Sequence, residues 1–186
     1  MNYQIFFALF MVFMILLRYF EISLYEKKKT KGEIRDKWTI NFLGIAYSSY
    51  LVLVVVEFLV VNRQINYTVA AIGMVLWVAR FFLKRWGATT LSEFWSADIE
   101  IRENHRVIRK GPYKFLRHPV YLSNVIDVIA VALIANAYYM LSSGAVLMVL
   151  AIYSRIPFEE KALISKLGDE YRQYRKETYA LIPFIL

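Results

Sequence analysis

The chain of 186 residues contains no cysteine, which excludes disulfide bridges, thiolate nucleophiles and cysteine-ligated metals. Its two histidines, His105 and His118, are too few for a protein-only zinc site without carboxylate ligands, so we expect no metal. Its seven glycines form neither G-x-G nor G-x-x-x-x-G-K, so the glycine-rich loops of dinucleotide-binding and P-loop folds have no candidate. A nucleotide-like cofactor would have to be held in another way.

Long stretches of the chain lack charge, and 59% of the residues are hydrophobic, more than one soluble core of this size would hide. A membrane-spanning helix takes roughly 20 mostly apolar residues. The sequence therefore predicts an all-α integral membrane protein of about five transmembrane helices. The predicted spans are Asn2 to Leu17, Ile40 to Val61, Tyr67 to Leu83, Val120 to Ala135 and Ala137 to Tyr153, the last two joined by a tight turn at Asn136.

The basic residues that give the chain its net charge of +8 are grouped. Six lie between Lys27 and Lys37, eight between Lys84 and Arg117, and six between Arg155 and Lys176. With five spans these blocks fall on one side of the membrane, which the positive-inside rule makes the cytoplasm. This distribution predicts an external N-terminus and argues against nucleic acid as the partner.

No repeat or linker divides the chain, so residues 1–186 are expected to form a single membrane domain. Residues 1–83 contain three spans, and residues 84–186 contain the residues suited to chemistry. Apolar and aromatic residues at steps of three and four between Ile156 and Tyr179 predict an amphipathic cytoplasmic helix with a break at Gly168. We expect Pro157 to begin this helix rather than to continue the preceding one.

The stretch from His105 to Tyr121 mixes charges with aromatic residues. Gly111-Pro112 indicates a turn, and Pro119 is well placed as the first residue of a span. The N-terminal end of that span would favour an anionic group beside Arg117 and His118.

Polar residues continue into the same span at steps of three, through Tyr121, Asn124 and Asp127. An acid at this depth usually faces a cavity or a partner. A functional role for Asp127 and a structural hydrogen bond are both open, whereas for Glu57, nearer the outer end of its span, we favour a structural role.

Arg155, Glu159 and Glu160 follow the fifth span. They could form an interfacial helical ion pair of small energy. They could equally fix a cationic cofactor and an anionic acceptor, and the spacing does not choose between these roles.

Three motifs in this half resemble the isoprenylcysteine carboxyl methyltransferase family and its bacterial and phospholipid-methylating relatives. They are G-P-Y-x-x-x-R-H-P-x-Y from Gly111 to Tyr121, R-x-x-x-E-E-x-x-L from Arg155 to Leu163, and G-x-E-Y-x-x-Y from Gly168 to Tyr174. The resemblance implies S-adenosylmethionine bound in a cytoplasm-facing pocket made by the last two membrane helices and their flanks. It also implies a lipid-like or prenylated methyl acceptor that reaches the site from the bilayer.

The resemblance implies roles for eleven residues. Arg117, Arg155 and Glu160 would lie near the transfer point as catalytic residues. The cofactor pocket would be formed by His105, Val107, Ile108, Gly111, Tyr113, His118, Tyr121 and Glu159.

Methyl transfer to a carboxylate needs positioning, which Arg117 or Arg155 could supply. A phenol or enol would need a base, for which Glu160 or His118 is the candidate. The acceptor therefore stays open among a prenylcysteine carboxylate, a phenolic or polyketide lipid and a phospholipid amine.

Two alternative functions remain, an NADPH-dependent membrane sterol or lipid reductase and a non-enzymatic membrane protein. The oligomeric state is not predicted.

Overall fold

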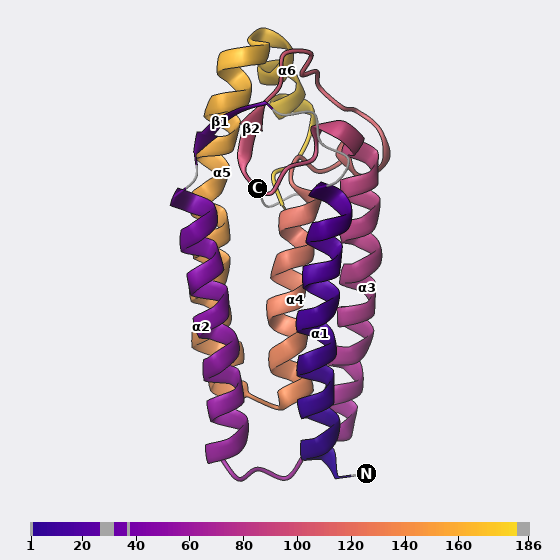
Figure 1. The fold of residues 1–186 in the computed structure, drawn as a ribbon, viewed down its shortest axis with the longest axis vertical. Coiled ribbons are helices and arrows are strands. Elements are labelled where there is room, and N and C mark those ends of the chain that lie inside the picture. The colour runs from indigo at the N-terminus through magenta and orange to yellow at the C-terminus, as the bar shows by residue number, and fades with distance from the viewer. Residues whose placement is uncertain (1, 27–31, 37, 182–186) are drawn as a thin grey trace.

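The computed structural model describes residues 2–26, 32–36 and 38–181, and five long helices lie side by side in it (Figure 1). They are α1 (Tyr3–Glu26), α2 (Trp38–Val60), α3 (Tyr67–Leu91), α4 (Pro119–Ala135) and α5 (Ala145–Leu167). A short helix, α6 (Asp169–Glu177), and a small sheet lie at the end of the bundle away from the N-terminus.

The apolar runs of the sequence form these helices. Four helical stretches are long and apolar enough to cross a membrane, namely Tyr3–Glu21, Trp38–Val60, Tyr67–Phe94 and Met140–Leu167. The helix α4 is also apolar but has 17 residues, fewer than the roughly 20 that span the hydrocarbon unaided. The protein is therefore a mostly helical integral membrane protein, and α4 is the element on which a count of five spans depends.

The expectation of an all-α protein is wrong at one place. Strand β1 (Glu33–Asp36) pairs antiparallel with β2 (Ile99–Ile101) above the bundle. Ile99 and Ile101 are buried against Ala162 of α5, while the residue between them is only partly buried. This alternation is the period of a strand, but three residues are too few to reveal it in a sequence.

The prediction for Pro157 is also wrong, because this proline lies inside α5. Proline removes one main-chain hydrogen bond, here the bond to the carbonyl of Tyr153. Burial of Arg155, Ile156 and Glu160 on the same helix holds the turn around it together. The expected break at Gly168 is present, since this glycine has φ +59° and separates α5 from α6.

The helices α3 and α4 pack most closely. A Cβ on Gly73 of α3 would lie 2.8 Å from the backbone nitrogen of Ile134 and 2.9 Å from the carbonyl oxygen of Ala130. Glycine is thus required for this approach. The core around the contact is apolar and includes Val128, Val131 and Trp77.

The turn after α4, on the way to α5, forms at Asn136, as predicted, with the left-handed conformation φ 53°, ψ 33°. Glu57 of α2 accepts hydrogen bonds from the backbone nitrogens of Tyr139 and Met140, at 3.0 and 2.8 Å, and pairs with Arg63 at 2.8 Å. The carboxylate thus caps the helical turn Met140–Gly144 that leads into α5, which agrees with the structural role expected for Glu57.

Candidate active site

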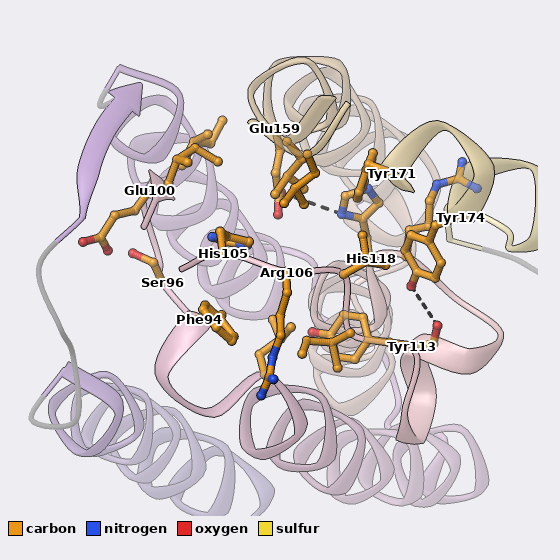
Figure 2. Close-up of a pocket in the computed structure, with 18 of the residues that line it drawn as sticks. Phe94, Ser96, Glu100, His105, Arg106, Tyr113, His118, Glu159, Tyr171 and Tyr174 are labelled. Atoms are coloured by element: carbon orange, nitrogen blue, oxygen red, sulfur yellow. Dashed lines mark hydrogen bonds and ion pairs between the residues drawn. The ribbon is translucent and has the colours of Figure 1, made fainter. Parts of the chain in front are cut away.

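A pocket with about 690 Å³ of empty space, open solvent included, lies at the end of the bundle that carries the sheet and α6. In Figure 2, Phe94, Ser96 and His105 line one side and face Glu159, His118 and Tyr171. We call this space the polar cavity.

The segment before α4 is held in place by the end of the chain. Backbone nitrogens of Arg117 and His118 donate to the carbonyls of Tyr179 and Ala180, at 2.8 and 3.0 Å. This pairing directs both side chains to the mouth of α4, which begins at Pro119 as predicted.

The turn Gly111–Lys114 precedes this segment. Gly111 has φ +54°, and a Cβ there would also lie 2.8 Å from Oγ1 of Thr90. The hydroxyl of Tyr174 donates to the carbonyl of Tyr113 at 2.7 Å, which ties the turn to α6. Gly111 therefore shapes the cavity without lining it.

Glu159 of α5 is an acidic group that lines the cavity. Its carboxylate accepts a hydrogen bond of 2.5 Å from the hydroxyl of Tyr121 and lies 3.7 Å from Nδ1 of His118. The rings of His118 and Tyr121 stack with centroids 5.3 Å apart and an interplanar angle of 7°. The side chain of Glu159 remains 30% exposed, so its charge faces the open space of the cavity.

Aromatic groups form the opposite wall. The rings of Phe94 and His105 lie 5.0 Å apart. Burial, with the Arg102 guanidinium nearby, lowers the pKa of His105, so this imidazole is neutral at physiological pH. Burial raises the pKa of Tyr113 and Tyr171 well above the usual tyrosine value, so both phenols keep their protons.

Glu160 points away from the polar cavity. Its carboxylate is 2.7 Å from Nε of Arg117, 3.0 Å from Nε of Arg175 and 3.3 Å from Nε2 of His118. The side chain is only 6% exposed. These contacts join α4, α5 and α6 through one carboxylate.

A second pocket, with about 1,120 Å³ of empty space, open solvent included, lies among α2, α4 and α5. Most of its lining is apolar, and we call it the apolar chamber. Ser96 lines both cavities, and Tyr121, which lines the chamber, donates to Glu159 of the polar cavity. The two spaces therefore meet at Ser96, Tyr121 and Glu159.

Arg155 lines the chamber at this junction. It is 2% exposed, and one terminal nitrogen donates to the carbonyl of Ala97. Its Nε and second terminal nitrogen have no hydrogen-bond partner among the residues that the structure describes. Buried donors of this kind are costly unless a ligand satisfies them.

The structure brings nine of the eleven predicted site residues to the two cavities. Tyr121 and Arg155 line the chamber, while Gly111 and Glu160 line neither. The polar cavity is lined by His105, Val107, Ile108, Tyr113, Arg117, His118 and Glu159.

Sequence reasoning missed several lining residues. Phe94 and Ser96 follow α3 in a short turn, and Glu100 belongs to the unpredicted strand β2. Arg106 also lines the cavity, with its guanidinium 5.9 Å from the Phe94 ring. Four further lining residues did carry a signal, because they belong to the apolar and aromatic face of the predicted C-terminal helix: Leu163, Leu167, Tyr171 and Tyr174.

A family model described as the isoprenylcysteine carboxyl methyltransferase (ICMT) family matches residues 71–165. The chain belongs to this family. The matched segment extends from α3 to α5 and contains the junction of the two cavities. Family membership makes the chain a membrane methyltransferase and accounts for the motifs between Gly111 and Leu163.

Three relatives from different organisms are 23–28% identical to the chain over the residues that align. An uncharacterized protein of Bacillus subtilis, YpbQ, is 23% identical over 73% of this chain and 84% of its own length. The methanethiol S-methyltransferase of Mycobacterium tuberculosis is 28% identical over 80% of this chain and 68% of its own. A probable protein-S-isoprenylcysteine O-methyltransferase of rice, Oryza sativa, is 28% identical over 63% of this chain and 62% of its own.

A solved structure has the same fold. It is a eukaryotic intramembrane Ras methyltransferase of the ICMT family, with a TM-score of 0.63 and 23% identity. The likeness covers 75% of this chain and 52% of that one. The helical membrane architecture is therefore that of the family.

Proposed function

We propose that this chain transfers the methyl group of S-adenosylmethionine to a lipid-like acceptor at the cytoplasmic face of a membrane. The polar cavity would hold the cofactor, and the apolar chamber would hold the acceptor. The observation that carries the proposal is the junction of the two spaces at Tyr121 and Glu159, with Ser96 in both linings. A polar cofactor and an apolar acceptor can meet there without either leaving its preferred environment.

The residues of the polar cavity fit S-adenosylmethionine, which supplies an electrophilic methyl group on a positively charged sulfur. A sulfonium favours a carboxylate and aromatic faces, and Glu159 lies beside the stacked rings of His118 and Tyr121. An adenine favours flat neighbours, which Phe94 and neutral His105 provide. Tyr113, Val107 and Ile108 would complete the enclosure.

Arg155 is the group best placed to orient the acceptor. Its side chain lines the chamber next to Tyr121, and two of its buried nitrogens have no partner among the described residues. A guanidinium holds an anionic oxygen through paired N–H donors and so fixes the direction of attack. Arg155 would thus position the acceptor oxygen, while Tyr121 and Glu159 would hold the acceptor and the cofactor in contact with each other.

Arg117 and Glu160 have a different part in this proposal. Their contact of 2.7 Å, together with Arg175, links α6 to the mouth of α4. We therefore propose that Glu160 holds Arg117 and His118 at the cavity, rather than contacting the acceptor.

The cytoplasmic orientation follows from charge. The surface segment between α3 and α4 and the segment after Arg155 carry most basic residues of the described chain, and both lie at the end that holds the polar cavity. The positive-inside rule assigns this end to the cytoplasm, where S-adenosylmethionine is available.

The proposal is tested with purified protein, methyl-labelled S-adenosylmethionine and a lipid extract. We expect label in the lipid fraction, a loss of turnover of at least about 100-fold in Arg155→Ala, and unchanged cofactor affinity. Arg155→Lys should recover only part of the rate, because lysine lacks the planar fork. Arg172→Ala, on the exposed face of α6, is the matched control and should retain the wild-type rate. Wild-type turnover in Arg155→Ala would remove this residue from the reaction.

A further inference from the structure

A cluster of charged side chains lies inside the bundle, below the junction of the two cavities. Asp127 of α4 accepts from the hydroxyl of Tyr47 at 2.5 Å and pairs with Arg18 at 3.1 Å and Arg80 at 3.0 Å. Asp127 is completely buried. A carboxylate at this depth therefore has partners on α1, α2 and α3.

Glu21 of α1 extends the cluster. It lies 2.6 Å from the ammonium of Lys84 and 3.5 Å from the guanidinium of Arg80. Arg80 and Lys84 are one turn apart on α3, so Arg80 bridges the two acids.

Among the side chains that the structure describes, the cluster has more positive than negative charges. Three cations, Arg18, Arg80 and Lys84, face two acids, Glu21 and Asp127. An excess positive charge inside a membrane protein is costly and usually faces a cavity or a partner. If the cluster served only to join helices, equal numbers of positive and negative side chains would be enough.

The excess is directed to the apolar chamber. Arg80 is 1% exposed and does not line the chamber, whereas the side chains of Arg18 and Lys84 are 22% and 9% exposed and do line it. Among the described lining residues there is no aspartate or glutamate. Lys84 has three N–H donors, and within the described chain only Glu21 accepts from them.

The two cations are separate from Arg155. Tyr121, beside Arg155, and Asp127, beside Arg18, are six residues apart on α4, which corresponds to about 9 Å along the helix axis. The chamber therefore has one cationic point at its junction with the polar cavity and another deeper among the helices.

We propose that Arg18 and Lys84 form an anion-binding subsite of the apolar chamber, which receives a negatively charged oxygen group of the acceptor. The identification of this ligand as the methyl acceptor rests on the function proposed above. The acceptor is then an amphiphile with two oxygen-bearing groups, one presented to Arg155 and one held deeper by Arg18 and Lys84. An amine-headed acceptor without such a group would leave this subsite unpaired.

Two substitutions that break the same ion pair separate binding from structure. Lys84→Met leaves two cations with two acids, so the cluster becomes neutral, whereas Glu21→Gln raises its excess to two positive charges. Binding of carboxyl-labelled dodecanoate to each protein in nonionic detergent is followed by NMR, with dodecanol as the uncharged probe of equal chain length. No cofactor or turnover enters this measurement, so its failure would leave the proposed methyl transfer standing.

We expect Lys84→Met to weaken dodecanoate binding by about tenfold or more and Glu21→Gln to strengthen it, with dodecanol binding unchanged in both. Arg18→Met should weaken dodecanoate binding to a similar extent as Lys84→Met. Equal losses in Lys84→Met and Glu21→Gln would show that the ion pair serves only to hold the helices, and would overturn the proposal. Unchanged dodecanoate binding in Lys84→Met and Arg18→Met would overturn it as well.

Discussion

At the scale of single residues, the site combines neutral aromatic groups with the partly exposed carboxylate of Glu159. His105 and Tyr113 are kept uncharged by burial, while Glu159 faces the cavity with its charge. This arrangement suits a cationic ligand, because the Glu159 carboxylate lies beside aromatic rings that are polarizable but neutral.

The lowered pKa of His105 makes stability depend on pH. The unfolded imidazole takes up a proton near pH 6.5, whereas the folded one resists it, so the folded state loses stability as pH falls below about 6.5. The melting temperature should therefore fall more between about pH 7 and about pH 5.5 in the wild type than in His105→Gln. Equal falls in both proteins would show that His105 titrates normally in the folded state.

The sequence predicted Glu159 in the cofactor pocket and Glu160 near the transfer point, so both were expected at the site. Adjacent residues on a helix, however, point about 100° apart. Glu159 therefore faces the cavity and Glu160 faces Arg117 and Arg175. Which of two neighbouring acids points to a ligand depends on the helix rotation, and this is set by packing.

At the scale of elements, apolar runs predicted the long helices closely, because main-chain hydrogen bonding leaves a membrane segment few other structures. The same reasoning could not find β1 and β2, since four and three residues give no period. It also misjudged Pro157, because the penalty of one lost hydrogen bond is small beside the packing of α5.

The close contact between α3 and α4 at Gly73 should be sensitive to side-chain volume. In Gly73→Ala the added methyl group would meet backbone atoms of Ile134 and Ala130, and we expect a loss of about 1–3 kcal/mol in stability. Gly44→Ala in α2 is the matched control, because a Cβ there meets nothing within 4 Å and alanine favours the helix. Melting temperatures in detergent compare the two. A similar change in both variants would contradict the close approach.

At the scale of the whole molecule, the sequence predicted two functional halves, whereas the structure distributes the site over more of the chain. Arg18 and Tyr47, from α1 and α2, line the chamber together with Lys84 and Arg155. Contacts between helices far apart in sequence have no signature in spacing, so the part played by the first two helices became visible only in the fold.

The absence of cysteine allows a clean test of topology. Glu103→Cys, between β2 and α4, and Gln64→Cys, between α2 and α3, place single thiols at exposed positions on opposite ends of the bundle. A membrane-impermeant maleimide added to intact cells should label Gln64→Cys only, and Glu103→Cys should react after lysis. Labelling of both from outside, or the reverse order, would contradict the cytoplasmic orientation.

The most direct test of the account is calorimetric binding of S-adenosylmethionine to the detergent-purified protein, with NADPH as the rival ligand. We predict that S-adenosylmethionine binds and that NADPH does not. Glu159→Gln should lower the affinity for S-adenosylmethionine by about tenfold or more, because the sulfonium loses its carboxylate partner. Glu170→Gln, exposed on α6, should bind as the wild type does. Binding of NADPH alone, or unchanged S-adenosylmethionine affinity in Glu159→Gln, would contradict the assignment of the polar cavity.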